Sequence, residues 1–179
     1  MKKMISFFTD SIKPVHIIIT AALTILMLAV MDIYSLPTIA KAAGGIPAFD
    51  LQTFGYSYET ATQFLNNLSQ SGRNLFLHFQ LPLDFAFAFV YTFLFLTLFI
   101  RLHPVGSKLC FIPLILFVLD IIENSLSVVL LKADNISTGP VKLASTVTFS
   151  KNLFTWLCSL IIIVFLILWF KNRKKNQKA

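Results

Sequence analysis

The stretch LCFIPLILFVLDIIENSLSVVLL, residues 109–131, decides the fold, because it is long enough to cross a bilayer and carries ionisable side chains near its middle. As a helix rising about 1.5 Å per residue, it would cover the roughly 30 Å of the hydrocarbon core. An ionisable group at that depth costs about 2.5 to 3.5 kcal/mol on insertion scales, so it needs a polar partner. Four polar side chains share one face of this helix, at positions i, i+3, i+4 and i+7: Asp120, Glu123, Asn124 and Ser127.

The rest of the chain has a similar composition. Of its 179 residues, 56% are hydrophobic and only 13% are charged, which is typical of polytopic membrane proteins rather than of soluble domains. Three further apolar stretches of spanning length are separated by polar or turn-forming segments. The sequence therefore predicts an all-α fold, a single domain over residues 1–179 with four transmembrane helices at about residues 15–33, 82–101, 109–131 and 145–170.

Basic residues are distributed unequally between the two ends of the predicted bundle. The end with the N-terminus, the 101–108 turn and the C-terminal tail carries ten Lys and Arg residues, and the other end carries five. Because cytoplasmic segments are enriched in Lys and Arg, both termini are predicted to be cytoplasmic. The tail KNRKKNQKA, residues 171–179, supplies much of the net charge of +7 and is expected to touch anionic headgroups, so we expect no nucleic-acid partner.

The first apolar helix has some features of a secretory signal peptide, since MKK precedes it and the small residues of IAKAAGG follow it. Its apolar run is longer than a usual signal core, and Asp32 and Tyr34 precede any plausible cleavage site. We therefore expect this helix to be retained as the first span.

The segment between the first two spans has helical periodicity in its second half. From residue 61 onward, apolar side chains recur at helical spacing with polar residues between them. Ser57 is a suitable N-cap, and Glu59 lies in the first turn, where the helix dipole favours a carboxylate. We expect an amphipathic helix over about residues 57–80, on the outer surface or capping the bundle, with a break at Gly72.

Polar groups on several helices fall at similar depths when the rise per residue is counted from the cytoplasmic end. Asp120 comes out near the midplane, while Glu123 lies in the outer half, level with Asp84. Groups at one depth can meet around a pocket that opens toward the outer side. We predict a catalytic set, Asp120, Glu123 and Asp84, and a ligand-binding set, Asn124, Ser127, Lys151, Asn152, His78, Arg73 and Trp156.

Two interpretations of these polar groups stay open. In one, Asp120 and Glu123 exchange protons with a substrate while the ligand-binding set orients its polar headgroup. In the other, the same groups only hold helices together, through hydrogen bonds between helices and a buried Asp84–Lys151 pair. The alignment of a whole polar stripe with polar groups on other helices favours the first interpretation.

Several kinds of site have no support in the sequence. GxSxG, P-loop, HExxH, CxxC and EF-hand patterns are absent, and the three histidines are widely separated. Cys110 and Cys158 are expected at different membrane depths, so neither a disulfide nor a metal site is indicated. We therefore predict no metal and no cofactor.

Three segments carry a resemblance: FGYSYE (residues 54–59), GRNLFLHFQLPLD (72–84) and DIIEN (120–124). Together they resemble a family of small four-helix integral membrane proteins of bacteria, which implies a location in the bacterial inner (plasma) membrane and no established catalytic residues. In helix count and in carboxylates facing a lipid-filled core, the chain is also similar to the sterol-isomerase and sigma-2-receptor group. That group's motif spacing is not found here, so this similarity is one of architecture only.

Three functions are compatible with these features. The first is binding of a lipid or other lipophilic small molecule, which carboxylate acid/base chemistry could also modify. The second is a small proton-coupled transporter or channel subunit, for which four helices predict a homo-oligomer. The third is an accessory protein that binds another membrane protein through the amphipathic segment. Whether the protein is an enzyme stays open at this point.

Overall fold

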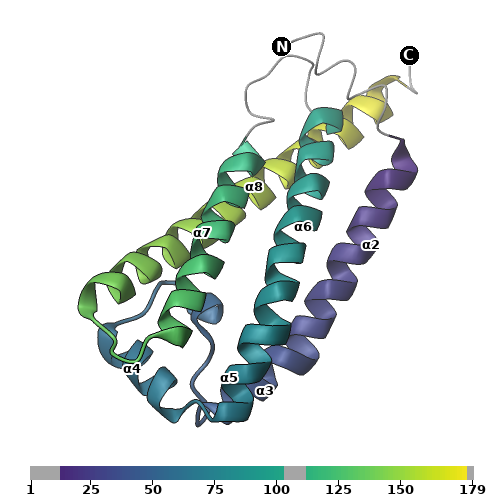
Figure 1. Ribbon diagram of the computed structural model, residues 1–179. Helices are drawn as coiled ribbons and strands as arrows, with labels where there is room; N and C mark the ends of the chain where they lie inside the picture. The colour runs from purple at the N-terminus through teal and green to yellow at the C-terminus, as the bar shows by residue number, and fades with distance from the viewer. Residues whose placement is uncertain (1–12, 103–111, 177–179) are drawn as a thin grey trace.

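The regular elements of the protein are helical in the computed structural model, which describes residues 13–102 and 112–176 (Figure 1). Four helical segments are long and apolar enough to cross a membrane: Pro14–Ala42, Gln70–Leu102, Ile112–Lys132 and Thr138–Trp169. The predicted all-helical fold with four long apolar helices is confirmed, and the length and composition of these helices support the assignment to membrane proteins.

The first two spans are composite. The first consists of α2 (Pro14–Val30), a π-helical turn (Met31–Ser35) and α3 (Leu36–Ala42), and the second consists of α5 (Gln70–Leu75), a π-helical turn (Phe76–Gln80) and α6 (Leu81–Leu102). The third and fourth are the single helices α7 (Ile112–Lys132) and α8 (Thr138–Asn176). Between the first two spans, the connecting segment holds a short 3-10 turn (Phe49–Leu51) and α4 (Tyr58–Asn67).

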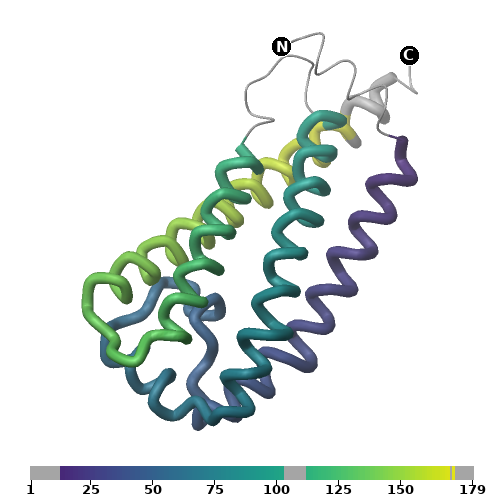
Figure 2. The backbone as a smooth tube through the Cα atoms, in the orientation of Figure 1, coloured from purple at the N-terminus to yellow at the C-terminus, as the bar shows by residue number. Residues whose placement is uncertain are grey.

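The spans run alongside one another, as Figures 1 and 2 show. α8 packs against α7 and α6, and α2 packs against α6. The start of α2, the end of α6 and the C-terminal part of α8 lie at one end of the bundle (Figure 2). The connecting segment, residues 43–69, covers the other end, which we call the capped end.

The first two spans are longer than the sequence predicted, because helix continues through two prolines. The first span extends past residue 33 to Ala42, and the second begins at Gln70 rather than at residue 82. A proline ring clashes with the carbonyl four residues earlier in a regular α-helix. Leu36 precedes Pro37 and Leu81 precedes Pro82. The Leu36 N–H donates to the Met31 carbonyl and the Leu81 N–H donates to the Phe76 carbonyl, each five residues back, so a wider π-helical turn ends just before each proline.

The fourth span also begins earlier than predicted, at Thr138 rather than at residue 145. The first turns of this helix contain polar residues, so their hydropathy is too low to indicate a membrane span. Its N-terminal portion is held by packing against α4 and the 3-10 turn. The third span was predicted to begin at residue 109, which lies outside the described residues.

The helical connecting segment breaks at Leu68, and not at Gly72 as predicted. Leu68 is extended, and Ser69 begins a new helix by accepting a hydrogen bond from the Gly72 N–H at 3.2 Å. Ser57 caps α4 in the same way, accepting from the Thr60 N–H at 3.1 Å. The hydroxyl caps, rather than the glycine, therefore determine where these helices start.

Two hydrophobic clusters fill the bundle, one on each side of a polar layer. The cluster at the capped end centres on Phe49, Phe64 and Phe76, whose ring centroids lie 4.9 to 6.4 Å apart. The other cluster, toward the opposite end, includes Phe99 and Leu116. Along α7 and α8, the buried polar residues Asp120, Glu123, Asn124, Ser127 and Thr148 fall between residues of the two clusters, so an apolar core lies on each side of the polar layer.

Gly72 provides a test of the packing at the capped end. A Cβ atom at Gly72 would lie 2.5 Å from the Cβ of Ala42, whereas one at Gly139 would meet nothing within 4 Å. We predict that Gly72→Ala destabilises the protein by roughly 1–3 kcal/mol through overpacking, and that Gly139→Ala is neutral or slightly stabilising. Unfolding in mild detergent measures both variants, and equal stabilities would contradict the close approach of α3 and α5.

Candidate functional site

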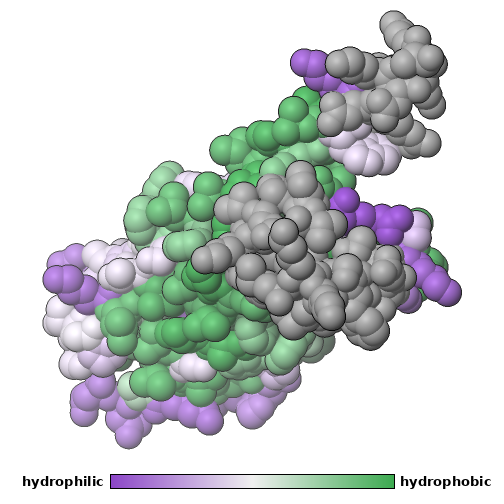
Figure 3. Space-filling model, turned by 90° about the horizontal axis from the view of Figure 1, so that it is seen from above, coloured by the Kyte–Doolittle hydropathy of each residue, from purple (hydrophilic) through white to green (hydrophobic). Residues whose placement is uncertain are grey.

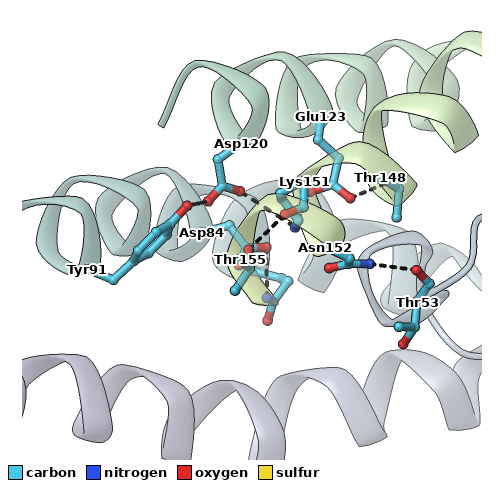
Figure 4. Close-up of polar contacts among 10 residues, drawn as sticks. Thr53, Asp84, Tyr91, Asp120, Glu123, Thr148, Lys151, Asn152 and Thr155 are labelled. Atoms are coloured by element: carbon cyan, nitrogen blue, oxygen red, sulfur yellow. Dashed lines mark hydrogen bonds and ion pairs between the residues drawn. The ribbon is translucent and has the colours of Figure 1, made fainter. Parts of the chain in front are cut away.

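A buried lysine between two carboxylates forms the centre of the polar layer. The Lys151 Nζ on α8 donates to Glu123 Oε2 and lies 3.6 Å from Asp120 Oδ1, both on α7 (Figure 4). Asp120 and Glu123 stand three residues apart, so one turn of α7 presents both carboxylates to a single ammonium. At about 1.5 Å per residue, this group lies roughly 20 Å along α8 from its first residue.

Two hydroxyl groups complete the hydrogen bonding of the carboxylates. The Tyr91 hydroxyl on α6 donates to Asp120 Oδ2, and the Thr148 hydroxyl on α8 donates to Glu123 Oε1 at 2.7 Å. Tyr91 and Thr148 are themselves buried. Buried charges are tolerated when they are paired and hydrogen-bonded, so this arrangement ties α6, α7 and α8 together at one depth.

A second branch of the polar layer links the first two spans through their π-helical turns. The Ser35 hydroxyl, at the end of the first turn, donates to Gln80 Oε1, at the end of the second. The Gln80 amide then donates to Asp84 Oδ2 at 2.9 Å. Each π-helical turn therefore presents its last side chain to the other span, a local irregularity that is frequent at functional sites.

Asp50 approaches the polar layer from the connecting segment. Its Oδ1 is buried without a hydrogen-bond partner, although the residue as a whole is partly exposed. Burial raises the pKa of Asp50 to about 6; the ammonium of Lys151 opposes this effect and the carboxylate of Glu123 adds to it. The loop thus contributes a titratable group that interacts with the centre of the layer.

Acidic groups outnumber basic groups in this layer. Asp84 interacts electrostatically with Asp50, Lys151 and Asp120, so four carboxyl groups surround the centre when Glu123 is included. Within the described residues, Lys151 is the only cation that forms an ion pair with any of them. The layer is therefore suited to a proton or a positively charged group.

A partly open pocket of about 320 Å³ reaches this centre from the side of the bundle. Its polar part contains Asp120 and Lys151, and its apolar part contains aromatic rings of α6 and a leucine of α2. The complete lining is Thr24, Leu28, Phe87, Tyr91, Phe95, Asp120, Lys151, Asn152 and Thr155. A molecule in this pocket would contact both charged groups and an apolar wall.

The structure brings some of the predicted residues together. Asp120, Lys151 and Asn152 line the pocket, and Glu123 and Asp84 lie directly behind them (Figure 4). The other two members of the α7 stripe, Asn124 and Ser127, are buried nearer the capped end. The Asn124 amide nitrogen has no hydrogen-bond partner there.

Other predicted residues lie apart from the pocket. Arg73 donates to the Leu131 carbonyl and, at 3.2 Å, to the Leu65 carbonyl, so it fastens α5 to the ends of α7 and α4. His78 is exposed. Trp156 is 48% exposed and packs edge-on against Phe54 with ring centroids 6.0 Å apart, on the outer side of α8.

Several residues of the layer were not predicted, and some of them carry a signal in the sequence. Tyr91 stands seven residues after Asp84, and Gln80 four before it, so all three share one face of the second span. Thr148 stands three residues before Lys151, on the same face of α8. Asp50 belongs to an irregular segment without periodicity, so no pattern indicates its position.

The raised pKa of Asp50 makes a prediction about pH and stability. Because the folded-state value of about 6 lies above the unfolded value of 3.8, the folded protein binds this proton more tightly. Stability from Asp50 is therefore fully present below about pH 4 and is lost as the pH rises toward 6. We predict that Asp50→Asn raises the melting temperature above pH 6 and has little effect near pH 4.

The control for this prediction is Asp134→Asn, which removes an exposed carboxylate. Melting temperatures of both variants and the wild type are compared across this pH range in the same detergent. A difference between Asp50→Asn and the wild type that does not change with pH would show that Asp50 titrates normally.

Comparison with known proteins gives no relative from which a role for this site could be transferred. No protein-family model, curated protein or solved structure matches the chain. Within the residues that the structure describes, no group of three or more His, Cys, Asp or Glu side chains is arranged to hold a metal ion. The chemistry of the site therefore has to be inferred from its own geometry.

Proposed function

We propose that this integral membrane protein binds a lipid or other lipophilic small molecule in the pocket bounded by α2, α6 and α8. The observation that carries the proposal is the composition of the pocket, which joins an apolar, aromatic wall to the Asp120–Lys151 pair. Ligand sites of this kind combine apolar walls with a few polar groups that fix orientation. Such a pocket suits a molecule with an apolar body and a polar end.

The surroundings of the pocket support entry from the bilayer. Only 11% of the most apolar stretch of the first span is buried, against 44% in the second span. Figure 3 shows hydrophobic surface over much of the visible bundle, with hydrophilic residues gathered toward its edges. A ligand dissolved in the hydrocarbon could therefore reach a pocket beside α2 without crossing water.

The same geometry would support acid/base chemistry on the bound molecule. Asp120 and Lys151 both line the pocket, so either could exchange a proton with a ligand atom. Glu123 has both oxygens engaged, by Lys151 and Thr148, which gives it the role of positioning the ammonium. Asp84 accepts a hydrogen bond from Gln80 and does not line the pocket, so its role would be to change the electrostatic potential at Asp120 and Lys151.

We place the capped end outside and both termini in the cytoplasm of a bacterial cell, with the chain in the inner membrane. The excess of Lys and Arg at the end that holds the termini supports this orientation. The basic residues at the C-terminal end of the chain, 171–179, would then touch anionic headgroups. In this orientation α4 is an amphipathic helix over the outer end of the bundle, with Phe64 facing inward.

A proton-coupled function is a second candidate, and Asp50 favours it. This group lies outside the spans at the capped end and interacts with Lys151, Glu123 and Asp120, so it could pass protons from the outer side. A role as an accessory protein has less support, because apolar residues of the amphipathic segment that would contact a partner, such as Phe64 and Leu68, are buried in the protein's own core.

A pocket-filling substitution tests the proposal. Leu28 on α2 lines the pocket, whereas Leu26 on the same helix is 60% exposed and does not. We predict that Leu28→Trp reduces the amount of co-purified lipophilic molecule several-fold and that Leu26→Trp leaves it unchanged. Mass spectrometry of molecules extracted from equal amounts of protein measures this. Equal ligand content in Leu28→Trp and the wild type would contradict the proposal.

A further inference from the structure

Most hydrogen-bond donors in the pocket are already used by the protein. The Thr24 hydroxyl donates to the Thr20 carbonyl at 2.7 Å, and the Thr155 hydroxyl donates to the Lys151 carbonyl at 2.9 Å. The Asn152 amide nitrogen donates to the Thr53 carbonyl at 3.2 Å. The Tyr91 hydroxyl is bonded to Asp120. A ligand would find few donors in this wall.

The ammonium of Lys151 is similarly committed. It has three N–H donors, of which one is bonded to Glu123 and another faces Asp120. Because the Asp120 contact is too long for a hydrogen bond, at most two N–H groups remain for a ligand, and both lie beside carboxyl groups. The pocket is therefore poorly suited to a carboxylate or phosphate group, which would need several donors to replace its hydration.

Acceptors, in contrast, remain available. Asp120 Oδ1 makes only the 3.6 Å ion pair with Lys151, which is too long for a hydrogen bond. The side-chain carbonyl oxygen of Asn152 points away from Thr53 (Figure 4) and accepts from no donor among the described residues. Each threonine hydroxyl that donates to the backbone still has lone pairs. The free groups of the pocket therefore call for a ligand that donates hydrogen bonds.

The charged groups and the aromatic lining restrict the chemical class of the ligand further. The centre holds two acidic side chains and one basic side chain, so it can accept a second cation beside Lys151. Phe87, Tyr91 and Phe95 follow one another on one face of α6, with neighbouring ring centroids 4.9 and 5.7 Å apart. The faces of such rings attract cations, and Arg and Lys are absent from the lining apart from Lys151.

We infer that the pocket recognises a lipophilic amine: an amphiphile whose protonated amine donates to Asp120 Oδ1 and Asn152 Oδ1 while its apolar body lies along Phe87 and Phe95. This inference rests on the proposed function and specifies its ligand class. An alcohol offers only one donor and no charge, and an anionic lipid meets a site in which acidic groups outnumber basic ones. Both are weaker matches to the available groups.

Three probes with the same dodecyl chain test the inference: dodecylamine, whose protonated form has three N–H donors, dodecanol and dodecanoate. The protein is placed in nanodiscs of zwitterionic lipid at neutral pH, and saturable binding is measured by native mass spectrometry. Binding that Leu28→Trp abolishes is assigned to the pocket, which separates it from partition into the lipid. We expect the amine to bind about tenfold more tightly than dodecanol or better, because its hydrogen bond is charge-assisted. Dodecanoate should show no saturable binding.

Variants test the residues. Asp120→Asn should weaken amine binding about tenfold and leave dodecanol nearly unchanged, because it removes the charge but keeps the shape. Asp134→Asn, an exposed change of the same kind, should leave amine binding as in the wild type. Phe95→Leu, which keeps the charged groups, should weaken the amine more than dodecanol and provides a test should Asp120→Asn fail to fold.

The outcomes separate the inference from the proposed function. Pocket binding that is equal for amine and dodecanol, or stronger for dodecanoate, would overturn the inference and leave the proposed function standing. If no probe binds in a manner sensitive to Leu28→Trp, and Leu28→Trp also retains the wild-type content of co-purified lipophilic molecules, both fail together. Preference for the amine that survives Asp120→Asn and Phe95→Leu would place the amine outside this pocket and overturn the inference.

Discussion

The ammonium of Lys151, held between Asp120 and Glu123, is the interaction on which the rest of this bundle depends. A charge inside a membrane bundle must find its counter-charge within the protein, and here α7 supplies two carboxylates to one lysine of α8. Tyr91 and Thr148 then bond the remaining carboxylate oxygens. The depth and rotation of α6, α7 and α8 are fixed together by these four partners of one centre.

Two π-helical turns connect the first span to this centre. Each precedes a Leu-Pro pair, and the Ser35–Gln80 hydrogen bond joins their last residues. Because the turns carry the helices through Pro37 and Pro82, the first two spans remain continuous while one polar side chain of each is brought to the partner helix. The first span is otherwise little buried, and this leaves space beside it for the pocket.

The sequence predicted helices and their polar faces correctly where the helical spacing of residues matches their burial. Apolar runs of spanning length revealed the four long helices, and the i, i+3, i+4, i+7 spacing identified the polar face of α7. Counting the helical rise placed Asp84 at the depth of Glu123, because every α-helix advances by about the same distance per residue. The ends of the spans were missed, since Pro37 and Pro82 normally stop a helix and only the structure shows the wider turns.

Contacts made by irregular segments could not be predicted in this way. Asp50 and Thr53 reach the layer through a loop whose path no period describes. Arg73 was expected to hold a headgroup, yet its guanidinium bonds two backbone carbonyls at helix ends, a use that depends on the tertiary arrangement. The directions of the hydrogen bonds also could not be predicted, because they require the position of each donor and its acceptor. These directions determine which donors and acceptors of the pocket remain available to a ligand.

The central claim is that Lys151 and Glu123 are energetically coupled inside the bundle, and a double-mutant cycle tests it most directly. Glu123→Gln, Lys151→Met and the double variant are unfolded in mild detergent, with Lys132→Met and Asp134→Asn, both exposed, as the control pair. Breaking a buried pair leaves a charge without its partner, so we expect each single change to cost roughly 3 kcal/mol and the pair to be coupled by roughly 2 kcal/mol. The control pair should be additive. Additive effects of Glu123→Gln and Lys151→Met would contradict the account, because they would mean that this ion pair does not hold the bundle together.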